Sequence, residues 1–182
     1  MEKIYLFLIL SIPIIILSRK SLFNIKSHGF YRFFGWECIL WLLASNYRYW
    51  FYRPFSLLQL LSWIFLFISV YLVTVGVVLM KRSGKPDKSR NDNTLYQFEQ
   101  TTKLIDKGIF KHIRHPLYSS LLFLTWGIFL KYPTVESLIV SILSTTFLIL
   151  TTLFDEKECI DFFGDKYTAY MKRSKRFIPY LI

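Results

Sequence analysis

The residues best suited to chemistry lie in two short polar patches separated by a long apolar stretch. The first patch is Arg114-His115-Pro116-Leu117-Tyr118, and the second is Asp155-Glu156-Lys157-Glu158. Pro116 suits the first turn of a helix, where its missing N–H costs nothing, so His115 would lie at a helix N-terminus that attracts anions. If residues 117–154 form two antiparallel helices, both patches return to the same end of the pair. His115, Tyr118, Asp155 and Glu156 would then converge on one ligand.

Each of these residues also has an ordinary structural explanation. Tyr118 fits the aromatic belt of a membrane helix. Asp155 and Glu156 would mark the end of a helix, where acids oppose the macrodipole and therefore need a cationic ligand or a basic partner. His112 and His115 are three residues apart, as metal ligands on one helix face would be, but no cysteine lies near them. We therefore expect no metal site.

The composition predicts a membrane protein. Of the 182 residues, 53% are hydrophobic and 19% are aromatic, and the formal net charge is +11. Such a charge by itself would suggest nucleic acid. Because the basic residues fall between long apolar stretches, we expect them to face anionic lipid headgroups, and we expect no nucleic-acid partner. Cys38 and Cys159 are too few for a disulfide framework or a metal cluster.

Five apolar stretches predict an all-α, multi-pass membrane protein with about five transmembrane helices. They are residues 4–18, 33–52, 55–80, 117–132 and 137–154. The third stretch gives the strongest signal, with 26 residues and no charge. The second is the weakest, because Glu37 and Arg48 lie within it, and we expect Glu37 to lie near one interface. The first is expected to be retained, because no small-residue cleavage site of a signal peptide follows it.

The basic residues predict the orientation in the membrane. The segments 19–32, 81–114 and 157–176 contain 19 lysines and arginines, and the rest of the chain contains four. We therefore expect these segments and the C-terminus in the cytoplasm, in a bacterial inner membrane or the endoplasmic reticulum. The apolar spacing between residues 159 and 171 also predicts an amphipathic C-terminal helix at the membrane interface.

Taken together, the polar patches belong to one pattern that covers residues 95–182. Arg-His-Pro-x-Tyr opens an apolar hairpin, the paired acids follow, then Phe163-Gly164-Asp165-Lys166-Tyr167-x-x-Tyr170, and Arg176-x-x-Pro179 closes the pattern. This pattern resembles the isoprenylcysteine carboxyl methyltransferases and their relatives, the phospholipid methyltransferases. The resemblance implies a multi-pass enzyme that uses S-adenosylmethionine. It also divides the chain into an N-terminal membrane region and linker, 1–94, and a catalytic region, 95–182.

The resemblance further implies which residues bind the cofactor on the cytoplasmic face. They are Gln97, Thr102, Lys103, Leu104, Ile105, Phe110, His115, Pro116, Leu117, Tyr118, Asp155 and Glu156. No residue is assigned to catalysis. The sulfonium methyl group is already electrophilic, so the protein needs only to align the acceptor and exclude water.

Two departures from the family pattern bear on the chemistry. Phe110 occupies a position where many members have tyrosine, so one hydroxyl contact is missing. The carboxyl methyltransferases carry an arginine shortly before the paired acids, where this chain has Thr151 and Thr152. A substrate carboxylate would lack its cation there, and an unpaired buried carboxylate is costly. We therefore expect a lipid or lipophilic small molecule with an amine or thiol nucleophile.

Two other functions fit parts of the sequence. Membrane sterol reductases share a similar C-terminal helical architecture and use NADPH, but their His-Pro-Asn-Tyr motif is followed by a glycine and an acid. Here Ser119 and Ser120 follow Tyr118. A non-catalytic membrane scaffold with a basic face for anionic lipid is the second alternative. The paired acids and the aligned motif favour the methyltransferase.

Overall fold

All named elements of the structure are helices, which confirms the all-α prediction. The computed structural model describes residues 2–85, 87, 96 and 99–179. The α-helices are α1 (Glu2–Leu22), α2 (His28–Asn46), α3 (Leu57–Ser83), α4 (Pro116–Phe129), α5 (Val135–Phe163) and α6 (Asp165–Arg173), and the 3₁₀ helices are η1 (Tyr47–Tyr49) and η2 (Gly108–Lys111).

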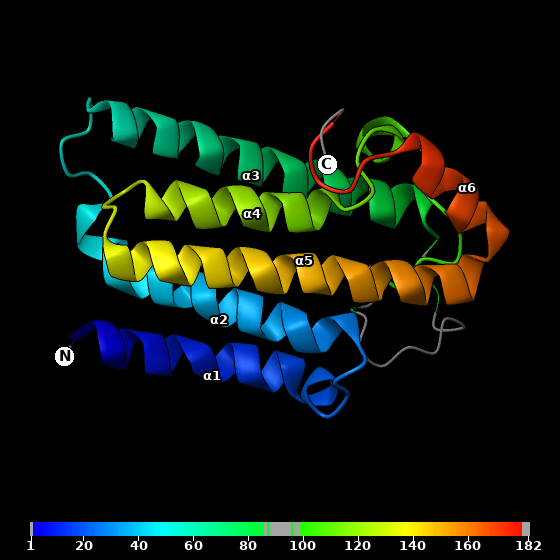
Figure 1. Cartoon of the computed structure of the whole chain (residues 1–182), viewed down its shortest axis with the longest axis horizontal. Helices are drawn as coiled ribbons and strands as arrows, with labels where there is room; N and C mark the ends of the chain where they lie inside the picture. Colours follow the sequence, from blue (N-terminus) through cyan, green and yellow to red (C-terminus); the bar gives the residue numbers. More distant parts are fainter. Residues whose placement is uncertain (1, 86, 88–95, 97–98, 180–182) are drawn as a thin grey trace.

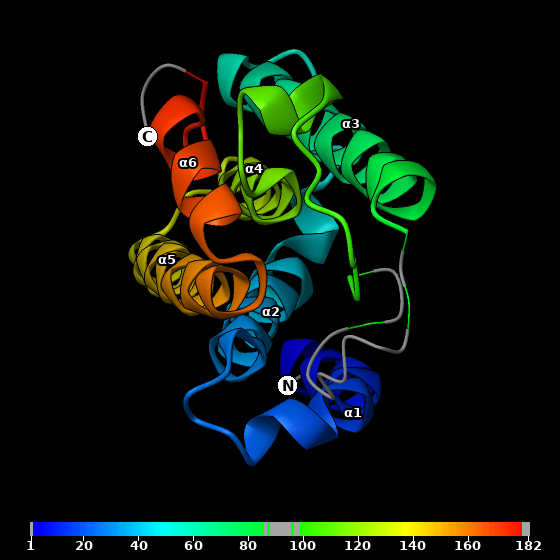
Figure 2. The same cartoon turned by 90° about the vertical axis from the view of Figure 1, so that its right-hand side faces the viewer.

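The five long helices lie side by side in the order α3, α4, α5, α2, α1 (Figures 1 and 2). Consecutive helices run in opposite directions, so the described parts of the three basic segments lie at the same end of the bundle. We call this the site end; it holds the start of α4, the last turns of α5, and α6. The opposite end, which holds the start of α1 and the turn between α4 and α5, is the far end.

Among the described residues, three helices are long and apolar enough to cross a membrane: α1, α3 and α5. The apolar α4 has 14 residues and reaches only about 21 Å. The second predicted stretch, 33–52, is displaced, because α2 begins at His28 and ends at Asn46. Glu37 therefore lies in the middle of α2, not near its start as the predicted stretch implied. Its Oε2 accepts a hydrogen bond of 2.5 Å from Ser11 Oγ, which joins α1 to α2.

The helix surfaces have the character of membrane helices. On α1 and α3 large apolar side chains face outward, such as Ile9, Phe67 and Val70, which are 64%, 68% and 61% exposed. Between helices, small residues allow close approach. A Cβ atom at Gly76 of α3 would lie 2.5 Å from Leu117 Cδ1 of α4, so a larger residue there would require the Leu117 side chain to shift.

The helix that carries the second polar patch is longer than predicted. α5 continues past Phe154 to Phe163, and its 29 residues span about 43 Å, more than the ~30 Å hydrocarbon core. Asp155 and Glu156 therefore lie inside the helix, so the alternative explanation that they end it is wrong. Gly164, with φ +60°, separates α5 from α6, so the predicted C-terminal helix begins only at Asp165.

Candidate active site

The first polar patch is held in place by the segment that follows α6. The Arg114 N–H donates to the Lys175 carbonyl at 2.7 Å, and the His115 N–H donates to the Arg176 carbonyl at 3.2 Å. α4 then begins at Pro116, with His115 as its N-cap residue. The C-terminal segment and the start of α4 together fix the position of the His115 side chain.

His115 is buried between two carboxylates of α5. Its Nδ1 lies 3.2 Å from Asp155 Oδ2, and its Nε2 lies 3.3 Å from Glu156 Oε1. Burial acts to lower the pKa of His115, but the hydrogen bonds to Asp155 and Glu156 outweigh it and raise the pKa above 6.5. Only the protonated ring can donate from both nitrogens. The geometry therefore favours the charged form of His115.

Glu156 is surrounded by basic side chains. Arg114 Nε donates to its Oε1 at 3.0 Å, and Arg176 donates from Nε to Oε1 at 3.1 Å and from Nη2 to Oε2 at 2.7 Å. The basic partner that the acids were expected to need is thus supplied by the chain itself. Because Glu156 is so fully engaged, its position connects α5, the first polar patch and the C-terminal segment.

A cavity lies beside His115. It contains about 700 Å³ of empty space, its open mouth included. Its lining consists of Met80, Glu99, Thr101, Leu104, Ile105, Phe110, Arg114, His115, Pro116, Leu117, Tyr118, Asp155, Cys159, Phe163, Tyr167 and Tyr170. The structure thus brings most of the predicted cofactor residues together. Thr102, Lys103 and Glu156 lie outside this lining, and Gln97 lies outside the described residues.

One part of the lining is an aromatic wall, made by Phe110, Phe163, Tyr167 and Tyr170. The Tyr167 ring contacts those of Phe163 and Tyr170, with centroids 6.5 and 5.8 Å apart. The Tyr170 hydroxyl donates to the Phe110 carbonyl at 2.5 Å, and burial raises the pKa of Tyr170 so that the hydroxyl keeps its proton. Such a wall suits a planar ring of a ligand.

Another part of the lining is polar and contains Glu99, Asp155 and Tyr118. Tyr118 is 7% exposed, and its ring lies 5.7 Å from that of His115. Its hydroxyl makes no hydrogen bond with any residue that the structure describes. Because buried hydroxyls normally have a partner, this one is available to a ligand.

Two basic residues near the start of α2, which were not predicted from the sequence, hold acids near the cavity. His28 Nδ1 lies 2.5 Å from Glu158 Oε2, and the His28 N–H donates to Oε1 at 2.9 Å. Arg32 Nη1 donates to both oxygens of Glu99, each at 2.9 Å. His28 and Arg32 are four residues apart and therefore share one helix face. That spacing was the signal in the sequence that could have found them.

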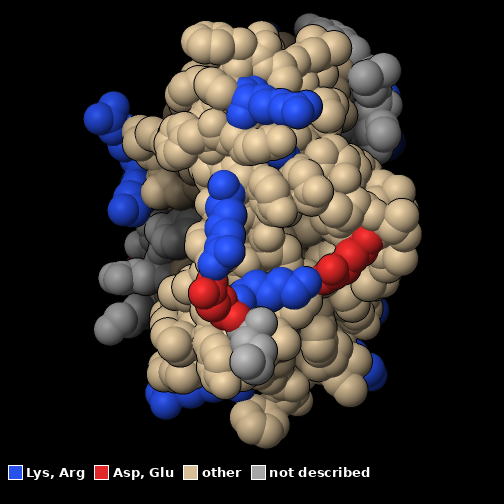
Figure 3. Space-filling model, turned by 90° about the vertical axis from the view of Figure 1, so that its left-hand side faces the viewer, with Lys and Arg blue, Asp and Glu red and all other residues tan. Residues whose placement is uncertain are grey.

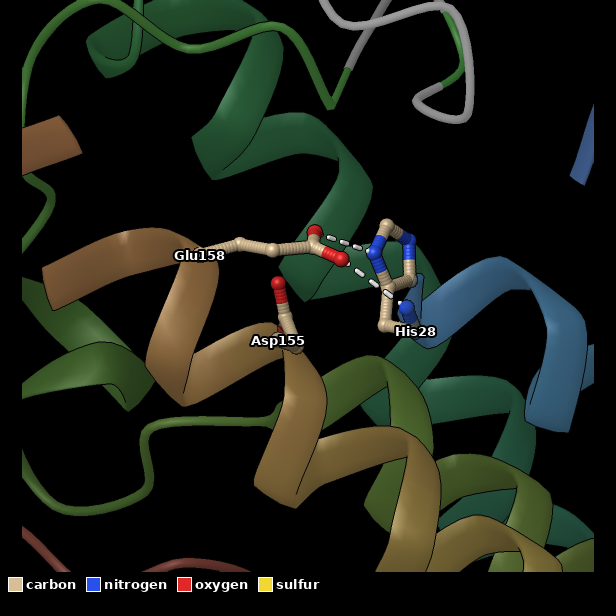
Figure 4. Close-up of side chains that lie close together, drawn as sticks. All are labelled: His28, Asp155 and Glu158. Atoms are coloured by element: carbon tan, nitrogen blue, oxygen red, sulfur yellow. Dashed lines mark hydrogen bonds and ion pairs between the residues drawn. The ribbon is translucent and has the colours of Figure 1, made fainter. Parts of the chain in front are cut away.

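One group of side chains is close enough together to be considered as a metal site: His28, Asp155 and Glu158 (Figure 4). Their donor atoms lie within 4.8 Å of one another. Two ligands of a tetrahedral ion with bonds of ~2.0–2.1 Å lie about 3.3 Å apart. The 2.5 Å contact between His28 and Glu158 is shorter, so it is the contact of a hydrogen-bonded ion pair.

Comparison with known proteins identifies the family to which this chain belongs. The sequence profile of the family described as phospholipid methyltransferase matches residues 64–166, more than half of the chain. The chain belongs to the phospholipid methyltransferase family. The matched region includes both polar patches. The phospholipid methyltransferase resemblance seen in the sequence is therefore confirmed.

The chain is similar to the methanethiol S-methyltransferase of Pseudomonas deceptionensis. The two are 32% identical over 73 residues. The alignment covers 40% of this chain and 27% of the relative, so the chain matches about a quarter of the relative's length. No solved structure matches the chain significantly. The family, the relative and the apolar helices together indicate a membrane methyltransferase.

Proposed function

We propose that this protein transfers a methyl group from S-adenosylmethionine to a lipophilic acceptor, and that the cavity beside His115 binds the donor. The observation that carries the proposal is the convergence of His115, Tyr118 and Asp155 on one cavity. These residues come from two helices and lie within the part of the chain that matches the methyltransferase family.

The cavity lining suits a donor of this kind. S-adenosylmethionine has a planar adenine ring at one end and a cationic sulfonium and ammonium at the other. The aromatic wall offers a surface for the ring, and aromatic faces also attract cations. Glu99 and Asp155 add carboxylate oxygens, which accept hydrogen bonds from ammonium or hydroxyl groups.

The protein's part in the reaction is alignment and the exclusion of water. The acceptor nucleophile must approach in line with the bond between sulfur and the methyl group, and a largely apolar cavity favours this geometry. A thiolate can react directly, whereas an ammonium must first lose a proton. We assign no residue as a general base.

The residues on α5 support an acceptor that is not a carboxylate. Thr151 and Thr152 are fully buried. Their hydroxyls donate to carbonyls of their own helix, at 2.7 Å to Phe147 and at 2.8 Å to Ile149. Arg114, the arginine in the cavity lining, is already paired with Glu156. An amine or thiol acceptor needs no cation, and the name of the methanethiol S-methyltransferase relative agrees with a thiol.

The test is methyl transfer from labelled S-adenosylmethionine by purified protein in detergent. The acceptors are methanethiol, phosphatidylethanolamine and a prenylcysteine analogue. We expect methylation of the thiol or the amine, and loss of activity in the Tyr118→Phe variant. Methylation of the prenylcysteine analogue that is insensitive to Arg114→Ala would overturn the argument about the acceptor. Absence of methyl transfer together with NADPH-dependent reduction of a sterol would overturn the proposed function.

We also propose that the chain is a multi-pass membrane protein whose site end and C-terminus face the cytoplasm. The basic segments gathered at the site end support this orientation. Lys166 at the site end and Arg53 at the far end are exposed. Single cysteines at these two positions, in a variant without Cys38 and Cys159, give the test. Labelling of Lys166→Cys by an impermeant reagent from outside intact cells would contradict the orientation.

A further inference from the structure

Glu99 lines the cavity, and its side chain is held by residues that do not line it. Both of its carboxylate oxygens accept from Arg32 Nη1 at 2.9 Å, and its Oε2 also accepts from the Tyr96 N–H at 3.0 Å. The side chains of Glu99 and Arg32 are only 10% and 5% exposed. Glu99 therefore lines the cavity with its carboxylate held in a fixed orientation.

Arg32 is itself immobilised by aromatic rings. Its guanidinium lies 5.2 Å from the centroid of the Trp36 ring and 4.6 Å from that of Tyr96. A planar guanidinium favours contact with aromatic faces, where it is attracted electrostatically. Arg32 lies on α2, outside the residues 64–166 that match the family, so the family match gives it no role.

We propose that Glu99 binds the primary ammonium group of the methyl donor and that Arg32 is the positioning residue for Glu99. The inference rests on the proposed function and extends it. If the adenine ring lies on the aromatic wall of Phe163, Tyr167 and Tyr170, the amino-acid end of the donor reaches the polar part of the lining. There Glu99 lines the cavity, and Arg32 fixes the position of its carboxylate.

The count of hydrogen bonds supports an ammonium at this position. An ionised carboxylate has about four acceptor sites. Arg32 and the Tyr96 N–H occupy three of those of Glu99, two of them on Oε2, so Oε1 keeps one site. Arg32 already balances the negative charge of Glu99. A ligand ammonium would therefore add a single charge-assisted hydrogen bond. Loss of such a bond weakens binding by about 10- to 100-fold.

The test is to measure the dissociation constants of three ligands on the full-length protein in detergent. The ligands differ in whether they carry the ammonium and the sulfonium, so they show which group Glu99 contacts. S-adenosylmethionine carries the sulfonium and the ammonium, S-adenosylhomocysteine keeps only the ammonium, and methylthioadenosine has neither. We expect Glu99→Gln to weaken binding of the first two by about tenfold and to leave methylthioadenosine unchanged. Glu136→Gln, a matched change at the far end, is expected to change none of the three.

Arg32 gives a second, independent readout. Arg32→Gln is expected to show the same ligand pattern as Glu99→Gln, Arg32→Lys to restore part of the affinity, and the double variant to be no weaker than Glu99→Gln alone. An equal loss for all three ligands would show that Glu99 is only structural, and a loss for S-adenosylmethionine alone would place it at the sulfonium. Either result, or no loss of affinity at all, overturns the inference about Glu99. The proposed function still stands in these cases if the wild-type protein binds S-adenosylmethionine. Wild-type protein that binds none of the ligands would overturn both.

Discussion

The two ends of the helix bundle contain the same kinds of charged side chain in opposite environments. At the site end, Glu156 is 5% exposed and is paired with two arginines and a histidine. At the far end, basic and acidic side chains lie at the surface (Figure 3). The side chains of the Lys3–Glu136 pair are 39% and 53% exposed. Water screens such surface pairs, whereas a buried charge depends on its partner. The charges at the site end therefore determine the structure around the cavity, and those at the far end do not.

Lys131 is the exception at the far end, and it shows a different way to bury a charge. It is 3% exposed, its Nζ lies 3.6 Å from the centroid of the Trp63 ring, and it donates to Gln59 Oε1 at 3.1 Å. No carboxylate contacts it among the residues that the structure describes, and burial lowers its pKa to about 8. The far end thus stabilises a buried cation with aromatic faces and amide oxygens, and the site end does so with carboxylates.

The largest difference between the ends is expected in stability. Glu156→Gln leaves Arg114, His115 and Arg176 without their shared carboxylate, which should cost about 3–5 kcal/mol of unfolding free energy. Glu136→Gln should cost less than about 1 kcal/mol, because its pair is exposed. Denaturant unfolding in detergent measures both, and similar losses in the two variants would refute the comparison.

A smaller effect, confined to the ligand, is expected from Tyr118→Phe. The hydroxyl has no partner among the described residues, so its removal should leave the unfolding temperature unchanged. If it contacts the donor, affinity for S-adenosylmethionine should fall by about 1–3 kcal/mol. Tyr132→Phe at the far end, where the ring stacks on Tyr49, is the matched control and should bind as wild type. A lower unfolding temperature with unchanged affinity would assign Tyr118 to packing.

The sequence pattern predicted that the two polar patches come together, because their convergence depends only on the geometry of a helical hairpin. A helical hairpin between Pro116 and Asp155 must return both polar patches to one end. The partners of the charges could not be predicted in this way. His28 and Glu158 are 130 residues apart, and helical spacing identifies the face of a side chain but not its partner.

The position of Glu37 within its helix was mispredicted for a related reason. Hydropathy averages over a window, so it placed the start of the second helix several residues late. The hydrogen bond of the Glu37 carboxylate to Ser11 on a neighbouring helix could not be predicted from hydropathy. The extension of α5 beyond Phe154 was missed because polar residues end a hydropathy signal without ending a helix.

The two ends are expected to respond to pH in opposite directions. The raised pKa of His115 means that its contribution to stability is complete below pH 6.5 and is lost as pH rises through the raised value. The pKa of Lys131 falls from 10.5 to about 8, so the unfolded chain binds more protons between these values and stability rises across that range. Unfolding temperatures of wild type, His115→Gln and Lys131→Met from pH 5 to 11 measure both. Parallel slopes in the three proteins would contradict the pKa shifts.

The smallest effect is expected from Lys3→Met at the far end. Its exposed pair with Glu136 should contribute less than about 1 kcal/mol, and salt should screen that contribution further. Unfolding at low and high ionic strength tests this expectation. A large loss that persists in high salt would mean that the far end is as dependent on its charges as the site end.

The most direct test of the central claim is equilibrium binding of labelled S-adenosylmethionine to the purified wild-type protein, with NADPH measured in parallel. The account predicts saturable binding of S-adenosylmethionine at one site per chain, reduced in Tyr118→Phe and unchanged in Tyr132→Phe, and no binding of NADPH. Saturable binding of NADPH, or S-adenosylmethionine binding that is indifferent to Tyr118, would contradict the assignment of the cavity.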